Sequence, residues 1–223
     1  MSGIDTETPA AAVGRRERNK AEKLLRIKEA AYGLFAEKGY DQATVRDIAR
    51  RAGVGLGTIF TYASDKRDLL FLIFNDRQDE LRRLSFAGIP EDADLLEQLM
   101  AAFAPFYRQF AAEPDFTRYL LRELTFYTEG IQAPRFQDGR LSIVTRMREL
   151  VEDAVADGRL GTAEDPRLVA EMIFGLYQSE LRLWLGGGTP SVEDGLGRLR
   201  RVLAILIDGL GPAGEDRRPL TKK

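Results

Sequence analysis

The chain has 223 residues, a formal net charge of −2 and 44 % hydrophobic residues, which is enough apolar material for one large folded domain or two small ones. It contains no cysteine and no histidine, which excludes disulfides, Cys–His and Ser–His–Asp catalysis and most zinc and haem sites. We therefore expect a folded protein without a cofactor, a metal or enzymatic activity, suited to a reducing cytoplasm.

Charge is distributed unevenly along the chain. Residues 1–68 carry 13 Lys and Arg against 10 Asp and Glu, a net of +3, whereas the remainder carries a net of −5. A basic arm runs from Arg15 to Lys28. Such an arm either reaches DNA phosphates or is a solvated tail. Neither interpretation is favoured, because Glu17 and Glu22 reduce the positive charge of the arm.

The two ends of the chain are expected to lack structure. Residues 1–14 are small, polar and acidic, unlike a secretion signal, and no apolar run approaches the roughly 20 residues of a membrane helix. We predict disordered tails at 1–14 and 212–223, a cytoplasmic location and no membrane partner. The first helix is predicted from the basic arm to Lys38, with Gly39 as its end and Tyr40 folding back onto its apolar stripe.

Residues 44–66 hold two short helical patterns separated by a turn with glycine, the spacing of a helix-turn-helix. In the first pattern Thr44 and Asp47 form a capping box, and Gly53 provides the left-handed residue that ends the helix. One apolar face is formed by Val45, Ile48, Ala49 and Ala52. The second helix is predicted over 55–62 with only Ile59 buried, and its small and hydroxyl side chains would let the backbone approach DNA closely.

These residues resemble the signature of the TetR family of bacterial transcriptional regulators. The matching positions are Thr44, Ile48, Ala49, Ala52, Gly53, Val54, Gly57, Thr58, Ile59, Phe60, Tyr62, Asp65, Lys66 and Leu69. Two positions depart from the pattern, because Gly55 replaces a phosphate-binding Ser or Thr and Ala63 replaces a packing Phe. The resemblance implies a helix-turn-helix DNA-binding domain at 15–64 and a ligand-binding and dimerisation domain at 65–211.

The resemblance also implies a function and the residues that perform it. The protein would be a homodimeric regulator, a repressor by the family's usual sign, that binds double-stranded DNA at a near-palindromic operator. Thr44 and Lys66 would bind phosphates, and Arg46 would reach a base edge or a phosphate. The implied DNA contacts are Thr44, Arg46, Gly55, Leu56, Gly57, Thr58, Phe60, Thr61, Tyr62 and Lys66.

Beyond residue 64 the pattern contains helical stripes separated by glycine and proline, without strand-like alternation. We predict an all-α chain of about nine helices. The later helices are expected at 65–87, at 95–112 with a kink at Pro105, from Pro114 through Tyr127, at 141–158, at 166–185 and at 191–209. Residues 130–139, which contain Pro134, are expected to form a break.

Large aromatic residues are frequent in the predicted helices between 95 and 185. Most of them are expected to be plain core, and the others are expected to line a cavity together with a few polar side chains. The candidate lining residues are Phe103, Phe106, Tyr107, Phe110, Tyr119, Arg122, Glu123, Phe126, Met147, Phe174, Tyr177 and Gln178. The resemblance implies that a small apolar or amphipathic effector binds there and releases the operator.

The last two predicted helices are apolar over more than one face. The surplus indicates that they pair with the same helices of a second subunit in a four-helix bundle, although a wholly intramolecular core is the alternative. The expected dimer interface is Ile173, Leu181, Trp184, Leu199, Val202, Leu203, Leu206 and Leu210.

Two other functions stay open on the residues alone. The chain would be a helical small-molecule carrier or enzyme with an incidental helix-turn-helix, in which Glu123, Glu129 and Glu171 supply acid or base. Alternatively it would be a regulator controlled by a protein partner, which docks on the last two helices.

Overall fold

The structure, a computed structural model, describes residues 9–210. All the regular elements in this part of the chain are helices, which confirms the all-α class. They are α1 (Pro9–Lys38), α2 (Val45–Ala52), α3 (Leu56–Ile59), α4 (Lys66–Ala87), α5 (Leu95–Ala112), α6 (Pro114–Glu123), α7 (Ala133–Ala156), α8 (Pro166–Gly186) and α9 (Val192–Leu210). Of the predicted tails, 1–8 and 212–223 lie outside the described residues, whereas 9–14 belong to α1 and correct the prediction there.

The described chain divides into two compact units. The head contains residues 9–74 and 127–134, and the body contains residues 75–126 and 135–210. The first part of α4 therefore belongs to the head, whereas the sequence placed the boundary after residue 64. Leu69, Leu70 and Phe71 are fully buried, and the ring of Phe71 stacks on Tyr127 with 3.7 Å between centroids. This packing explains why the boundary falls inside α4.

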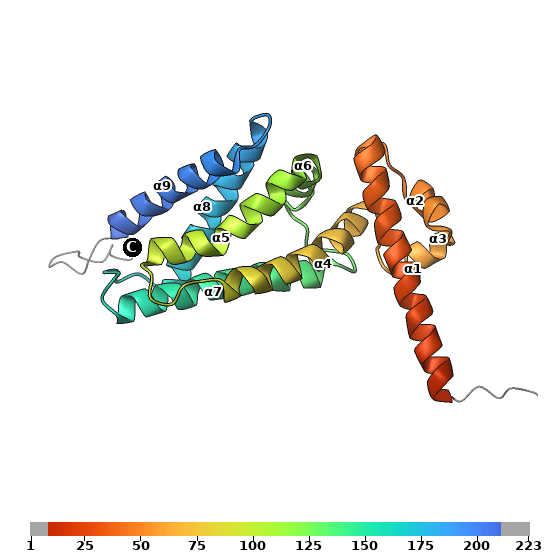
Figure 1. Ribbon diagram of the computed structural model, residues 1–223, viewed down its shortest axis with the longest axis horizontal. Helices are drawn as coiled ribbons and strands as arrows, with labels where there is room; N and C mark the ends of the chain where they lie inside the picture. Colours follow the sequence, from red (N-terminus) through yellow and green to blue (C-terminus); the bar gives the residue numbers. More distant parts are fainter. Residues whose placement is uncertain (1–8, 211–223) are drawn as a thin grey trace, which may run out of the picture. The chain divides into compact units, whose positions relative to one another are not determined.

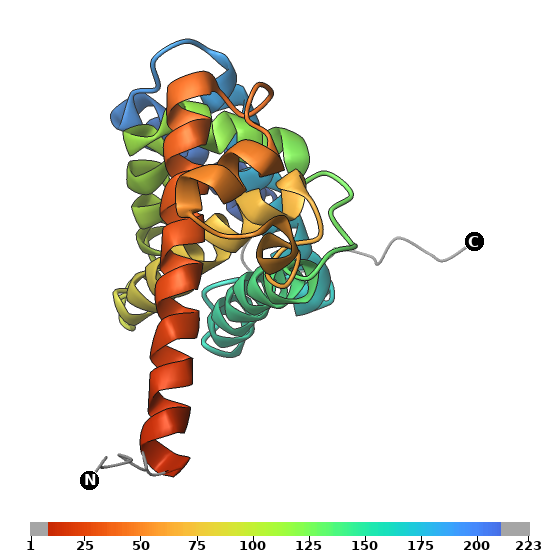
Figure 2. The same cartoon turned by 90° about the vertical axis from the view of Figure 1, so that its right-hand side faces the viewer.

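In the head, α2 packs against α1, beside its C-terminal half, and α3 contacts α2 (Figure 1). Ile27, Ile48 and Ile59 are completely buried, and Tyr40 folds back onto α1 as predicted, 5.2 Å from Phe35 between ring centroids. The N-terminal half of α1 extends beyond α2 and α3 (Figure 2). Helix α3 is shorter than predicted, since residues 60–62 form turns.

In the body, α9 packs on α5 and α8, and α6 contacts α5 and α8. Helix α5 has the predicted bounds with Pro105 inside it, and α8 begins at Pro166 after its cap, Asp165. A buried carboxylate joins α8 to α9, because Glu180 accepts hydrogen bonds from Arg198 at 2.5 and 3.3 Å. Each of these helices is thus fixed by both apolar and polar contacts.

Two sequence predictions for the middle of the chain are wrong. Helix α6 ends at Glu123, so Tyr127 is not on it. Helix α7 begins at Ala133 rather than after Gly139, because Pro134 fits the first turn of a helix, where no backbone N–H is needed. Gly139 is inside α7, and a Cβ there would lie 2.9 Å from a guanidinium nitrogen of Arg82 in α4.

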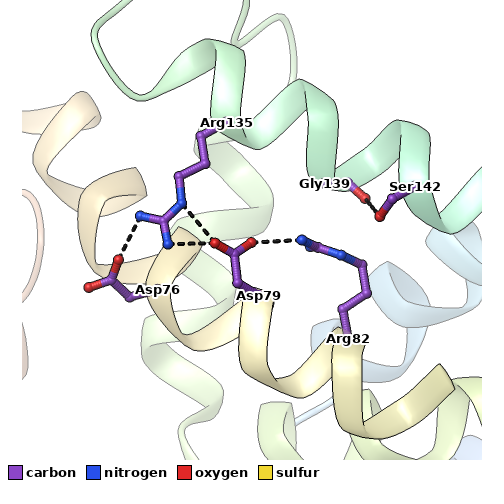
Figure 3. A network of polar contacts seen from close by, with 6 residues as sticks. All are labelled: Asp76, Asp79, Arg82, Arg135, Gly139 and Ser142. Carbon is purple, nitrogen blue, oxygen red and sulfur yellow. Dashed lines mark hydrogen bonds and ion pairs between the residues drawn. The ribbon is translucent and has the colours of Figure 1, made fainter. Parts of the chain in front are cut away.

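A polar network, the α4–α7 clamp, joins these two helices in the body (Figure 3). The Arg135 guanidinium donates to Asp76 at 2.6 Å and to Asp79 at 2.8 Å. Asp79 also accepts a hydrogen bond from Arg82 at 2.7 Å. Burial of Arg135 alone would lower its pKa, but the two carboxylates outweigh burial and hold the pKa above its ordinary value.

Candidate nucleic-acid interface and effector-binding body

Helix α2 begins and ends as the sequence predicts. The Thr44 hydroxyl oxygen accepts a hydrogen bond from the Asp47 backbone N–H at 3.1 Å and donates to the Asp47 carboxylate at 2.9 Å. This hydrogen bond from Thr44 holds the pKa of Asp47 below its ordinary value. Gly53 ends the helix with φ of 63°. The Thr44 hydroxyl is therefore already engaged in capping, and a phosphate would compete with Asp47 for its proton.

An ion pair fixes α2 against α1. The Arg51 guanidinium donates two hydrogen bonds to Glu37, both at 2.6 Å, and these lower the pKa of the Glu37 carboxyl. A Cβ at Gly33 would lie 2.8 Å from Arg51, so glycine leaves room for the arginine to cross α1. Arg46 is exposed on α2 and has no carboxylate partner among the residues that the structure describes.

Helix α3 presents an uncharged outer surface. Leu56 and Phe60 are 37 % and 46 % exposed, and Gly55 and Gly57 have no atom within 4 Å of an added Cβ. Thr58 and Tyr62 are half-buried, and the Thr61 hydroxyl donates to the Gly57 carbonyl at 3.2 Å. The predicted contact residues of this segment thus lie around one exposed tip, where the backbone is accessible.

Lys66 has a different setting from the other predicted DNA contacts. Its ammonium donates to the carbonyls of Tyr40 at 2.9 Å and Asp41 at 3.2 Å. It also lies 4.5 Å from the centroid of the Tyr40 ring. In this structure the charge of Lys66 holds the loop after α1 in place.

Asp68 is the centre of a buried polar cluster in the head, here called the Asp68 cluster. Its carboxylate accepts hydrogen bonds from the backbone N–H groups of Ser64 at 2.8 Å, Ile131 at 2.8 Å and Gln132 at 2.9 Å. The hydroxyls of Ser64 and Tyr127 donate to it as well. Asp68 itself is completely buried.

The environment of Asp68 keeps the carboxylate ionised. Burial alone would raise the pKa of Asp68, but the hydrogen bonds from Tyr127 and the three backbone N–H groups outweigh burial and leave the pKa below its ordinary value. Gly130 makes room for the cluster, since its φ is 127° and a Cβ there would lie 2.6 Å from an Asp68 oxygen. The segment 127–134 is thereby fastened to the first turn of α4.

In the body, the aromatic residues form a closed cluster around Tyr177. The ring of Phe103 stacks on Tyr177 with centroids 4.3 Å apart, and Phe106, Tyr107 and Phe174 lie 6.0–6.3 Å from it. Burial raises the pKa of the Tyr177 hydroxyl well above its ordinary value. Phe110 and Met147 are buried too, so most of the predicted lining residues belong to the packed core.

The remaining predicted lining residues lie in three places. Gln178 lines an open pocket of about 350 Å³ between α7 and α8, together with Phe174 of the aromatic cluster. Arg122 and Glu123 form an ion pair at 3.1 Å at the end of α6, with Arg122 5.7 Å from the Tyr119 ring. Phe126 is 88 % exposed and has φ of 58°. The structure thus does not bring Tyr119, Arg122, Glu123 and Phe126 to the pocket.

The residues of the predicted dimer interface lie in different settings within the single chain. Ile173, Leu181, Leu199 and Leu203 are buried in the core of the chain itself, and Trp184 donates to the Ser191 carbonyl at 2.7 Å and packs 4.6 Å from Tyr107 between ring centroids. The side chain of Leu210 lies outside the described part. The open apolar surface is a groove of about 510 Å³ lined by Met172, Gly175, Leu176, Val202, Ile205 and Leu206, here called the α8–α9 groove.

Several structurally important residues have no clear signal in the sequence. Asp68 lies inside the helix predicted at 65–87 without a pattern that marks its role, and Arg135 lies in the predicted break at 130–139. Gly130 carried a signal, because a glycine in a break often marks a positive φ. Arg140 and Arg167 line the pocket, but an exposed arginine on a helix has no sequence signal that separates a binding role from a solvated one.

Two further properties of the described residues bear on function. None of the described helices is long and apolar enough to span a membrane. No group of three or more carboxylates among the described residues is placed to hold a metal ion.

Comparison with known proteins gives the family. Residues 27–73 match the family profile of "Bacterial regulatory proteins, tetR family", and residues 92–194 match "Tetracyclin repressor-like, C-terminal domain". The HTH-type transcriptional repressor Rv1474c of Mycobacterium tuberculosis is 30 % identical over 177 residues, which cover 70 % of this chain and 92 % of the repressor.

Two further comparisons concern fatty acid metabolism or an acyl thioester. The fatty acid metabolism regulator protein of Bacillus subtilis is 24 % identical over 197 residues, covering 86 % of this chain and 98 % of the relative. The crystal structure of the transcriptional regulator FadR from B. subtilis in complex with stearoyl-CoA has a TM-score of 0.66 and 24 % identity, with 83 % of this chain and 98 % of FadR covered.

The matches cover the helix-turn-helix and most of the helical body, and they bear out the resemblance seen at residues 44–69. The chain therefore belongs to the tetR family of bacterial regulatory proteins and is a DNA-binding transcriptional regulator.

Proposed function

We propose that the protein is a homodimeric repressor that binds a near-palindromic operator and leaves it when the body binds an acyl-CoA thioester. The observation that supports DNA binding best is the tip of α3, where Gly55 and Gly57 leave the backbone open and Leu56 and Phe60 are exposed. Arg46 adds an exposed cation from α2. Such a tip fits the major groove, whose base edges an incoming helix can contact. As a repressor of bacterial genes it would act in the cytoplasm.

The α8–α9 groove supports a dimer. Its lining is apolar, and the residues at its rim, Met172 and Ile205, are 45 % and 70 % exposed. A second copy would cover this surface through a twofold contact between identical faces. Two recognition helices would then enter successive major grooves, roughly 34 Å apart.

The effector class is supported by the relatives. The B. subtilis relative is named for fatty acid metabolism, and FadR of B. subtilis was crystallised with stearoyl-CoA. An acyl-CoA combines an apolar chain with phosphate groups, and the body offers both apolar side chains and arginines at its surface pocket. Binding of such a ligand would weaken operator binding if it favoured a dimer geometry different from the DNA-bound one.

The DNA-binding part of the proposal is tested by selection from random duplexes at two salt concentrations. We expect a near-palindromic site to be enriched, with affinity that falls steeply as salt rises because the protein displaces counterions from phosphates. Arg46→Gln should lower affinity for the selected site by roughly 1–3 kcal/mol if Arg46 pairs with guanine. Arg83→Gln, which removes an exposed arginine paired with Glu80 on α4, is the charge-matched control and should change nothing.

The effector part is tested separately on the protein–operator complex. Adding stearoyl-CoA should release the operator, and saturating operator should weaken stearoyl-CoA binding by the same factor, because coupling between two binding sites is reciprocal. An operator affinity that stays constant across saturating stearoyl-CoA would refute this part and leave the DNA-binding part standing.

A further inference from the structure

The pocket between α7 and α8 combines cationic and apolar walls. Helix α7 contributes Arg140 and Leu141, and α8 contributes Arg167, Glu171, Phe174 and Gly175. Its volume of about 350 Å³ falls in the range of small-molecule sites. The pocket lies wholly within the body, beside the closed aromatic cluster.

Arg140 is the residue of this pocket whose charge is not neutralised. Its guanidinium lies 5.7 Å from the centroid of the Phe174 ring, and its nearest polar partner is the neutral side-chain oxygen of Gln137 at 3.4 Å. Among the residues that the structure describes, no carboxylate pairs with it. A guanidinium held over an aromatic ring keeps its planar N–H groups directed outward, where they suit a phosphate or carboxylate oxygen.

The second arginine of the pocket is already compensated. Arg167 pairs with Glu171 at 3.0 Å on the same helix. The pocket therefore has an excess of one positive charge, and that charge is at Arg140. Phe174 and Leu141 line the same pocket as Arg140. Phe174 is buried, whereas Leu141 is 62 % exposed, so an apolar group bound next to Arg140 would cover the exposed side chain of Leu141.

Gly175 connects the pocket to the dimer surface. It lines both the α7–α8 pocket and the α8–α9 groove, and an added Cβ would meet no atom within 4 Å. One turn of α8 is therefore the wall between the two. A ligand in the pocket would press on the same turn of α8 that a second copy contacts from the groove.

We propose that the α7–α8 pocket binds an amphipathic anion, with the anionic group on Arg140 and the apolar chain on Phe174 and Leu141. The identity of the biological ligand rests on the proposed function: it is an acyl-CoA thioester, whose phosphates supply the anionic group. A free fatty acid offers the same chemistry through its carboxylate. In this arrangement, Arg140 makes the pocket prefer anionic lipids to neutral ones.

The proposal is tested by isothermal titration of the full-length protein with lauroyl-CoA, laurate and CoA. We expect lauroyl-CoA to bind more tightly than CoA, because only the former has a chain. Arg140→Gln should weaken lauroyl-CoA binding at least about tenfold, as loss of one charged hydrogen bond predicts. Arg83→Gln should bind like the wild type. Equal affinity of Arg140→Gln and the wild type, or of CoA and lauroyl-CoA, would overturn the proposal.

A second variant tests the pocket without removing the arginine. Leu141→Glu places a carboxylate beside Arg140 at an exposed position, where folding is not at risk, and should abolish binding of lauroyl-CoA and laurate alike. Leu84→Glu, at a similarly exposed leucine on α4 outside the pocket, is the matched control. If both variants bind lauroyl-CoA normally, the ligand binds elsewhere in the body.

The outcomes separate this proposal from the proposed function. Release of the operator by lauroyl-CoA to the same extent in wild type and Arg140→Gln would keep the function and overturn the pocket. Binding of lauroyl-CoA that depends on Arg140, in a protein that selects no DNA sequence, would support the pocket and refute the function. If laurate binds as tightly as lauroyl-CoA and equally depends on Arg140, the pocket stands with a carboxylate as its anion.

Discussion

At the scale of single residues, two buried tyrosines differ in one hydrogen bond. Tyr107 and Tyr127 are both almost inaccessible, but the Tyr127 hydroxyl donates to Asp68, whereas the Tyr107 hydroxyl has no partner among the described residues. Burial raises the pKa of both hydroxyls. The tyrosine hydroxyl therefore stabilises the head at Tyr127, whereas at Tyr107 in the body its loss of water is not compensated by a hydrogen bond.

This difference gives a paired prediction. Tyr127→Phe should lower the free energy of unfolding by roughly 1–3 kcal/mol, because it removes a hydrogen bond to a buried carboxylate. Tyr107→Phe should leave that free energy unchanged or raise it slightly, since it removes a hydroxyl that has lost its water. Urea denaturation of both variants compares them directly, and equal losses would contradict the assignment.

The Asp68 cluster also predicts a dependence of stability on pH. The pKa of Asp68 lies below its ordinary value in the folded state, so ionised Asp68 favours folding above its unfolded pKa of roughly 3.9. That contribution is lost as the pH falls through the lower, folded pKa. We expect the stability difference between wild type and Asp68→Asn to be constant from pH 5 to pH 7, on the order of 3 kcal/mol, and to shrink below about pH 4. A difference that stays constant down to pH 3 would show that the charge is not the cause.

At the scale of elements, helix ends with local chemical signals were predictable. Thr44 and Pro114 cap or begin their helices as expected, because the signals for a helix start lie within a few residues in the sequence. Predictions failed where distant residues decide the structure. Pro134 fits the first turn of α7, but the ion pairs of Arg135 with Asp76 and Asp79 in α4 leave no local signal. Gly139 is tolerated inside α7, where Arg82 of α4 occupies the space of a side chain.

The sequence of α8 and α9 likewise does not reveal which apolar face is buried in the chain's own core and which remains open. Both helices are apolar on more than one face, and the pattern cannot say which face the chain's own core takes. Leu199 and Leu203 are buried in that core, while Ile205 remains exposed. Likewise, the aromatic residues of the body could be predicted as a group, but the division between closed core and open pocket depends on how α7 and α8 pack.

Two glycines of α9 give a prediction at this scale. A Cβ at Gly195 would lie 2.7 Å from the Trp184 ring nitrogen and 2.8 Å from a ring carbon of Tyr107, whereas a Cβ at Gly197 would meet nothing within 4 Å. Gly195→Ala should therefore destabilise the protein by about 1–3 kcal/mol through overpacking. Gly197→Ala should stabilise it by roughly 0.5–1 kcal/mol, because alanine is the better helix former. Thermal melts followed by circular dichroism distinguish the two, and a stabilised Gly195→Ala would show that α9 shifts freely.

At the scale of the whole molecule, the elements that pass between the units are joined on each side of the boundary. In the head, the Asp68 cluster fastens residues 127–132 to the start of α4. In the body, the α4–α7 clamp joins Arg135 to Asp76 and Asp79. A change in α7 on effector binding would therefore move α4 with it, and α4 leads directly into the helix-turn-helix.

A dimer formed through the α8–α9 groove can be tested at Ile205. Ile205→Glu introduces a charge at a side chain that is 70 % exposed in a single chain, so the fold of one subunit should change in stability by no more than about 0.5 kcal/mol. In a dimer formed through the α8–α9 groove, two such carboxylates would be buried near the twofold axis without partners, and burial of unpaired charges is strongly unfavourable. Light scattering after gel filtration should show a dimer for the wild type and for the control Leu84→Glu, and a monomer for Ile205→Glu. Loss of the dimer in Ile205→Glu should lower the affinity for a palindromic operator. The affinity for a single half-site should stay the same, because each monomer keeps an intact helix-turn-helix. A dimeric Ile205→Glu would place the interface on another face.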